Sequence, residues 1–363
     1  MNSPAEEPKS QPIRRPFSWR GFAGRALTTG GPFAGLLLAV VFFSYLTREE
    51  GTFLTEFNIR TIAVQSVIVG LAALGMTLVI VSAGIDLSIG SQVALVTVVT
   101  AVLGRDHGLP PLACVIGGTV VGTVCGMVNG LAIDRLKLMP FIVTLGTLQI
   151  YRGLAKLLAK NTAVYFPADA KPPWLGEIMA IEPGPKLEAF AKSLPPALAK
   201  PVLAVPPAVW LLIVMAVIVW VALRKTTWGR YVVAVGSNEA TARLCGLRVG
   251  VLKVSVYTFC GFLTGLAGIM QFAEMNGTGD PVVAGGLELE VIAAVVIGGG
   301  SLAGGEASVI GTLVGALVMR VLRSGCVHAG IPNATQDILI GAIIVSAVAL
   351  DKFRSGLARR RAG

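Results

Sequence analysis

The polar residues of this chain that could meet a solute lie inside or beside long apolar runs. Asp86 and Ser88 belong to the segment 83–90, which interrupts an apolar run that extends from residue 61 to residue 103. One interpretation is a tight turn in which Asp86 or Ser88 caps the next helix. The other is a break in a helix that faces a translocation path, where a carboxylate and free backbone groups can meet a polar solute. The motif leaves both interpretations open.

Other polar side chains fall within or at the ends of apolar segments. Asn129 and Gln149 lie inside such segments, where buried amides commonly bond a neighbouring helix and less often line a path. Arg152 is expected to extend its charge to the membrane surface. Glu274 is expected to be a simple interface residue, and Glu290, at the start of a segment, is explained by the helix dipole.

No catalytic or nucleotide site can be identified in the sequence. The glycine-rich run 298–305 lacks the Lys and Ser or Thr that a phosphate loop needs after its last glycine, because Glu306 and Ala307 follow instead. The five cysteines show no metal-binding spacing. We therefore predict that the chain is not an enzyme and binds no cofactor of its own.

The stretch 224–253 is a polar island between apolar spans, and it holds six of the thirty Lys and Arg residues. Within it, residues 237–246 have the order expected of one short helix, with a capping Ser or Asn, an acid in the first turn, an Arg near the end and a Gly just past it. A capped polar helix between spans is more than a connection requires, so we predict that it docks a cytoplasmic partner. The residues assigned to this helix are Ser237, Asn238, Glu239, Ala240, Arg243 and Gly246.

The composition predicts an all-α integral membrane protein. Of 363 residues, 54 % are hydrophobic and 14 % charged, and the mean hydropathy is +0.76. Soluble domains carry about 25 % charged residues. The 44 glycines suit helices packed through small residues. The net charge of +10 lies in short clusters at span ends, so we expect a lipid bilayer and no nucleic acid as partner.

The chain divides into a cytoplasmic tail (1–29), a transmembrane domain (30–350) and a basic cytoplasmic tail (351–363). A Pro-rich outer insertion (160–204) lies within the domain, as does the polar island. About ten transmembrane segments are predicted, with eight to ten full crossings because the eighth is short for the ~20 residues of a crossing. The segments are 33–46, 61–82, 89–103, 112–133, 140–158, 205–223, 254–275, 290–300, 309–322 and 338–350.

Positive charge predicts the orientation. With ten spans and the N-terminus inside, inner segments hold eighteen Lys and Arg residues and outer ones ten, with Arg320 and Arg323 counted as outer. Short loops rich in Lys and Arg stay in the cytoplasm. Both termini are therefore predicted to be cytoplasmic.

Four sequence blocks resemble the ribose/xylose-type sugar permeases of bacterial ABC importers. They are SAGIDLSIGS at 82–91, MPFIVTLGT at 139–147, GRYVVAVGSNEATARLCGL at 229–247 and AAVVIGGGSLAGG at 293–305. The resemblance runs from about residue 33 to residue 350, in the same order. The outer insertion 160–204 is longer and more Pro-rich than expected of ribose-type members, so a different cargo or a different contact with the binding protein is expected.

The resemblance implies a multi-pass permease of the bacterial inner membrane that works as a homodimer. Each copy would dock an ABC ATPase subunit, which binds ATP and Mg, and would receive a monosaccharide or related polyol from a periplasmic binding protein. The coupling helix of such importers maps to Glu239, Ala240 and Gly246. A path for uncharged sugars should carry neutral polar groups. We assign to it Asp86, Ser88, Asn129, Thr144 and Gln149, and Gln65 and Ser66 also fit.

Three alternatives compete with this function. A permease for an amino acid or a nucleoside would share the general architecture. An ion-coupled secondary transporter should show carboxylates or His chains inside the membrane, and apart from Asp86 and Glu residues at span ends the segments lack them. A membrane scaffold without transport would leave the capped helix 237–246 unexplained.

Overall fold

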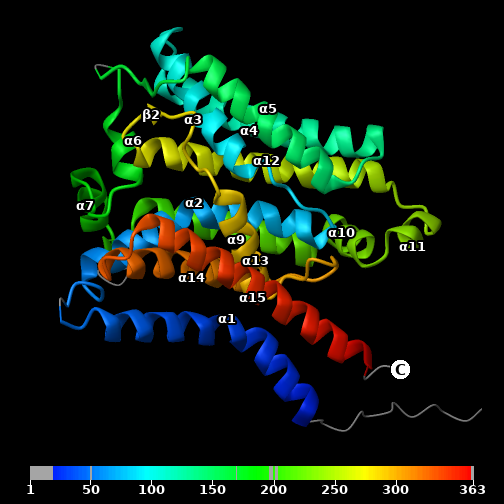
Figure 1. Ribbon diagram of the computed structural model, residues 1–363. Helices are drawn as coiled ribbons and strands as arrows, with labels where there is room; N and C mark the ends of the chain where they lie inside the picture. Colours follow the sequence, from blue (N-terminus) through cyan, green and yellow to red (C-terminus); the bar gives the residue numbers. More distant parts are fainter. Residues whose placement is uncertain (1–18, 50, 169, 196–198, 201–202, 361–363) are drawn as a thin grey trace, which may run out of the picture.

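The structure is a computed structural model that describes residues 19–49, 51–168, 170–195, 199–200 and 203–360 (Figure 1). Within these ranges the regular structure is helical apart from two strands of two residues each. The elements in chain order are α1 (Trp19–Leu46), α2 (Glu56–Val81), α3 (Ile89–Arg105), α4 (Pro111–Leu136), α5 (Pro140–Leu158), β1 (Val164–Tyr165), α6 (Pro173–Ile178), α7 (Pro185–Lys192), α9 (Pro207–Lys225), α10 (Thr227–Ser237), α11 (Glu239–Leu244), α12 (Val249–Glu274), β2 (Thr278–Gly279), α13 (Leu287–Ile297), α14 (Val309–His328) and α15 (Asn333–Arg360).

Each predicted apolar segment falls largely within one helix. Among the described residues, five helices are long and apolar enough to cross a membrane (α2, α4, α9, α12 and α14), and 30–46 and α3 are shorter apolar helices. The eighth predicted segment, 290–300, corresponds to α13, which has 11 residues. At 1.5 Å per residue such a helix spans about 16 Å, roughly half the ~30 Å hydrocarbon layer. The count of crossings stays a prediction.

Helix α2 forms the centre of the bundle. Every residue from Ser66 to Ser82 is buried, and the packing partners of α2 include α12, α14, α9 and α13. The helix is apolar on all sides, which is the pattern of a helix enclosed by others. The central position follows directly from this composition.

Helices α4 and α12 lie side by side (Figure 1), and glycines line the contact between them. Gly122, Gly126 and Gly130 recur every four residues on α4. The first two face Gly261 and Gly265 of α12, and Gly130 lies against Val254 and Tyr257 of the same helix. A Cβ on Gly126 would come within 2.8 Å of the Gly261 Cα, closer than real Cβ atoms approach their neighbours. Small residues at this spacing allow two backbones to meet, and the resulting van der Waals contact joins helices in a membrane.

The ends of the bundle differ. In Figure 1, α11 lies at one end, and the described chain begins in α1 and finishes in α15 toward that same end. The outer insertion 160–204 lies at the opposite end, where β1 pairs antiparallel with β2. Lys171 donates a 2.9 Å hydrogen bond to the backbone oxygen of Asn276, just after α12. The insertion is thereby tied to the far end of α12.

One prediction about a charged residue was wrong, and another about a helix end. Arg152 does not extend to the surface, because its guanidinium donates to the backbone oxygens of Pro281 (3.0 Å) and Val283 (2.7 Å). Arg320 and Arg323, which were counted as outer charges, lie within α14, which continues to His328, and their side of the membrane stays a prediction. The predicted segment 309–322 was too short, since Arg323 was read as the end of the apolar run.

The tails also differ from their predicted limits. Helix α1 begins at Trp19, within the predicted tail 1–29, and residues 1–18 lie outside the described ranges. Helix α15 continues to Arg360, so its backbone stays helical through most of the predicted basic tail 351–363. Charge marked the end of the apolar stretch, whereas the helix itself continues beyond it.

Candidate functional site

The polar island folds as two short helices rather than one. Helix α10 begins after Thr226, whose hydroxyl oxygen accepts a 3.1 Å hydrogen bond from the Gly229 amide, and it ends at Ser237. The Ser237 hydroxyl donates to the Val233 backbone oxygen at 2.8 Å. Ser237 therefore closes α10 and does not start the next helix. The predicted single helix 237–246 was wrong at this residue.

Asn238 starts α11. Its backbone is extended (φ −161°), and its side-chain oxygen accepts a 2.9 Å hydrogen bond from the Thr241 amide, the usual geometry of a helix N-cap. The helix ends in the pattern known as a Schellman motif, with Gly246 at φ +81°. The Leu247 amide donates to Ala242 at 3.1 Å, and the Gly246 amide donates to Arg243 at 3.0 Å. The predicted cap and terminal glycine are confirmed.

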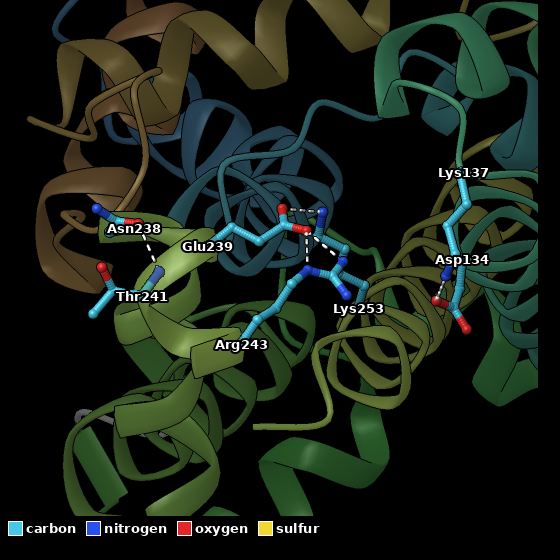
Figure 2. Close-up of polar contacts among 7 residues, drawn as sticks. All are labelled: Asp134, Lys137, Asn238, Glu239, Thr241, Arg243 and Lys253. Atoms are coloured by element: carbon cyan, nitrogen blue, oxygen red, sulfur yellow. Dashed lines mark hydrogen bonds and ion pairs between the residues drawn. The ribbon is translucent and has the colours of Figure 1, made fainter. Parts of the chain in front are cut away.

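Glu239 fastens α11 to α12 (Figure 2). Its Oε1 pairs with Arg243 Nη2 at 2.6 Å within the same helix, and its Oε2 pairs with Lys253 Nζ of α12 at 2.7 Å. Partial burial raises the pKa of Glu239, but the hydrogen bonds from Lys253 and Arg243 outweigh that effect and hold the pKa below its ordinary value. Exposed ion pairs of this kind stabilise by about 0.2–1 kcal/mol each. Lys253 was not predicted as a member of this site, although it lies near the start of the next helix, α12.

The free face of α11 is mixed in character. Ala242 points inward, buried with Val235 and Val249. Ala240 and Arg243 are exposed, and Leu244 is 89 % exposed. The buried Ala242 anchors α11 to the bundle, and the side chains of Leu244 and Arg243 stay exposed to solvent.

The end of α4 continues this polar surface (Figure 2). Lys137 Nζ pairs with Asp134 Oδ1 at 2.9 Å. Asp134 lies against Gly250 at the start of α12, where any Cβ would collide with the carboxylate. We call α11, the start of α12 and the end of α4 the docking surface.

The second group of predicted residues surrounds the break between α2 and α3. Asp86 is completely buried, and its Oδ1 accepts hydrogen bonds from the Ser88 amide (2.9 Å) and the Ser88 hydroxyl (2.6 Å). The Ser88 side chain makes no capping hydrogen bond at the N-cap position of α3, so the capping interpretation was wrong for Ser88. The Asp86 carboxylate does accept from the Ser88 amide near the start of α3, as a capping side chain would.

Side chains from three further helices enclose this break. The Asn129 amide donates to Ser88 Oγ at 2.8 Å and to Asp86 Oδ2 at 3.3 Å. Tyr151 of α5 donates to Asn129 Oδ1 at 3.0 Å, and Thr144 donates to the Ile85 backbone oxygen at 3.2 Å. Tyr257 of α12 donates to that same oxygen at 3.3 Å. The resulting set, which we call the Asp86 cluster, joins α2, α3, α4, α5 and α12.

Some members of the cluster were not predicted. Gln92 donates to Ser88 Oγ at 2.8 Å from one turn further along α3, a spacing that could have indicated it. Tyr151 and Tyr257 had no comparable signal in the sequence. Among the described residues, Gln92 Oε1 and Ser91 Oγ are buried without a hydrogen-bond partner.

The remaining predicted path residues lie elsewhere. Gln149 is exposed on α5 and is not among the hydrogen-bonded members of the Asp86 cluster. Ser66 is buried in α2 and donates to Ala63 at 2.7 Å, and Gln65 lines a separate cavity at the far end of the bundle. Within the described ranges no group of three His, Cys, Asp or Glu side chains could hold a metal ion.

Comparison with known proteins agrees with these features. The family described as "Branched-chain amino acid transport system / permease component" matches residues 58–348. The ribose import permease protein RbsC of Bacillus subtilis is 36 % identical over 325 residues, which cover 90 % of this chain and 93 % of that protein. RbsC of Escherichia coli is 33 % identical (87 % and 92 % covered), and the fructose import permease protein FrcC of Rhizobium meliloti is 35 % identical (89 % and 84 % covered). No solved structure matches.

Proposed function

Because this chain belongs to the family of branched-chain amino acid transport system permease components, we propose that it is the membrane-spanning subunit of an ATP-driven importer for a monosaccharide or related polyol. It is a multi-pass protein of the plasma (inner) membrane. Its relatives are named as permeases for ribose, fructose, D-allose and L-arabinose. The hydrolysis of ATP is assigned to a separate subunit.

The observation that carries the proposal is the docking surface. Helix α11 has six residues, is capped at both ends and is tied to α12 by the Glu239–Lys253 pair, yet it leaves Leu244 exposed. A short helix with fixed ends can transmit a push along the bundle axis instead of bending. We propose that the partner that binds this surface is the ATPase subunit.

Helix α12 is the element that would carry this movement. It begins at the docking surface, packs along the glycines of α4 and contributes Tyr257 to the Asp86 cluster. A shift of α11 would therefore reach the break between α2 and α3 through one rigid helix. Close-packed elements change between discrete arrangements rather than deforming continuously, which suits a permease that alternates between two states.

The predicted path residues Asp86, Ser88, Asn129 and Thr144 are all buried together in this conformation. We propose that they hold the break closed here and meet solute only when α12 shifts. Gln149 is not part of this buried group, and it would meet solute only at the exposed face of α5 on which it lies.

The other partners remain part of the proposal. A second copy of the chain would complete the permease, and a binding protein outside the cell would contact the end of the bundle that carries the insertion 160–204. With α11 in the cytoplasm, both ends of the described chain lie on the cytoplasmic side (Figure 1). Each partner can shift the permease only by preferring one of its states.

Reconstitution tests the proposal. The chain would be placed in liposomes with a candidate ATPase subunit and a candidate binding protein, and uptake of D-ribose, D-fructose, D-allose and L-arabinose would be measured with and without ATP. Uptake of at least one sugar that depends on ATP is expected. Sugar uptake that depends on an ion gradient and is the same with and without ATP would instead identify a secondary transporter and contradict the proposal.

One alternative has a specific observation in its favour. The description of the family names branched-chain amino acids. Leucine therefore belongs in the same assay, and ATP-dependent uptake of leucine with no sugar uptake would assign an amino acid as cargo.

A further inference from the structure

A polar cavity lies at the end of the bundle opposite the docking surface. Its volume is about 220 Å³, and it is enclosed by α2, α12, α13 and α14 together with the turn 283–285. The polar side chains that line it are Gln65, Gln271, Glu274, Glu290, Arg320 and Arg323. We call it the far-end pocket.

Helix α12 connects the far-end pocket to the docking surface. Lys253 and Glu274 lie 21 positions apart on this helix, which corresponds to about 30 Å at 1.5 Å per residue. That distance matches the thickness of the hydrocarbon layer. With α11 in the cytoplasm, the pocket therefore opens near the outer boundary of the membrane, where a solute would first enter.

The charges of the pocket are balanced among themselves. Glu290, of which only 6 % is exposed, pairs through Oε1 with Arg323 Nη2 at 2.6 Å and through Oε2 with Arg320. The Gln271 amide donates to Glu274 Oε2 at 3.0 Å. Two carboxylates and two guanidinium groups cancel, so the lining offers no surplus charge to an ionised ligand.

The pocket offers hydrogen-bonding groups to a ligand. The Gln271 amide and the Glu274 carboxylate both line it, and their mutual hydrogen bond uses only one carboxylate oxygen of Glu274. Ionisable residues inside a membrane commonly mark a substrate pathway. Hydroxyl groups of a ligand could donate to the second oxygen of Glu274 and bond to the Gln271 amide.

We infer that the far-end pocket is the site where the permease itself binds its cargo, an uncharged polyhydroxylated solute, before it passes the Asp86 cluster. This inference rests on the proposed function and adds a location and a ligand class to it. The volume suits one small solute, since pockets for drug-sized molecules measure about 300–1,000 Å³. An amino acid would bring a charge to each end, and Glu290 and the two Arg residues already neutralise one another.

Two substitutions test the site in the reconstituted system. Gln271→Leu removes the amide and Glu274→Gln removes the carboxylate charge and one acceptor oxygen, and both keep about the same side-chain size. At saturating sugar-loaded binding protein, each is expected to lower the ATP-dependent uptake rate about tenfold, the equivalent of one good hydrogen bond. The bound ATPase and the amount of inserted protein should stay unchanged. The matched control is Glu56→Gln at the start of α2, whose side chain is 79 % exposed.

Cysteine protection measures occupancy directly. Cys245 is the only exposed cysteine of the five, so Gln271→Cys would be made in a Cys245→Ala background and labelled with a membrane-impermeant thiol reagent. The sugar that the wild-type protein imports fastest should slow this labelling, whereas leucine should not. Val282→Cys, at a residue 62 % exposed beside the pocket, should be labelled at the same rate with and without sugar.

The outcomes separate the pocket from the general function. Wild-type sugar uptake with unaltered rates in both variants and no protection of Gln271→Cys would overturn the pocket and leave the importer intact. Protection by leucine in place of sugar would overturn the ligand class. Absence of ATP-dependent uptake of all four sugars by the wild-type protein would overturn both proposals.

Discussion

The two ends of α12 carry the same chemical arrangement in different surroundings. At the docking surface, Glu239 pairs with Arg243 and Lys253, and its side chain is 40 % exposed. In the far-end pocket, Glu290 pairs with Arg320 and Arg323, and its side chain is 8 % exposed. Water screens Glu239, whereas Glu290 is almost fully removed from water. A carboxylate with two basic partners therefore serves to position a helix at the docking surface. In the far-end pocket, removal of such a carboxylate would lower the stability of the fold much more.

The largest expected effect comes from breaking the buried set. Glu290→Leu leaves two guanidinium groups without their carboxylate and should lower the free energy of unfolding by about 3–5 kcal/mol. The matched change Glu239→Leu should cost no more than about 1 kcal/mol. Unfolding of both variants in mixed detergent would be measured beside the wild-type protein. Equal losses of unfolding free energy in the two variants would show that burial does not determine how much each ion-pair set stabilises the protein.

A second prediction concerns the contact that keeps α12 rigid between the two ends. Gly126→Ala places a Cβ 2.8 Å from the Gly261 Cα, and such overpacking should destabilise by about 1–3 kcal/mol. Gly146→Ala is the control, because nothing lies within 4 Å of a Cβ there, and it should stabilise α5 by up to about 1 kcal/mol. The same detergent unfolding measures both, and a neutral Gly126→Ala would contradict the close packing.

The third prediction tests the docking surface alone. Leu244→Asp replaces an exposed aliphatic side chain with a charge and should weaken binding of the ATPase about tenfold, or ~1.4 kcal/mol. Folding should be unaffected because the residue packs against nothing. Co-purification of the ATPase at several concentrations gives the affinity, with the quantity of inserted permease as control. Normal ATPase binding by this variant would remove Leu244 from the contact.

The smallest effect is expected from pH. The pKa of Glu239 is lowered in the folded protein, so its ion pairs stabilise above the ordinary pKa of about 4.3 and are lost as pH falls through the lower folded value. An environment-sensitive fluorophore on Cys245 should report loosening of α11 in acid, worth less than about 1 kcal/mol. Glu239→Gln should lack this transition. The same titration in both proteins would assign it to another group.

Local features of the site were predictable from sequence because they depend on neighbours along the chain. Asn238, Glu239 and Gly246 were identified from capping preferences, and each occupies its expected place in α11. The break at residues 83–90 was located from the polar interruption of an apolar run. Ser237 was misassigned because Ser and Asn are both good caps, and its hydroxyl bonds back to Val233 instead.

Contacts between helices could not be predicted in this way. Asp86 was expected either to cap a helix or to face a path, and its carboxylate does accept from the Ser88 amide. Its other partners, Asn129 and Gln92, come from α4 and α3, and Asp86 is completely buried. Arg320 and Arg323 were counted as outer charges at the end of a span, because a charge inside a membrane helix is costly unless a partner neutralises it. That partner, Glu290, lies thirty or more residues earlier in the chain.

The sequence by itself determined that this is a helical membrane protein, where its apolar segments lie, and that a capped helix interrupts them near residue 240. These properties follow from composition and from interactions between residues a few positions apart. Only the tertiary structure decided which charges neutralise one another. It also decided that one 26-residue helix, α12, joins the docking surface to the far-end pocket. Such pairings depend on how glycine-lined helices pack, and the distance between two residues along a chain does not indicate their distance in space.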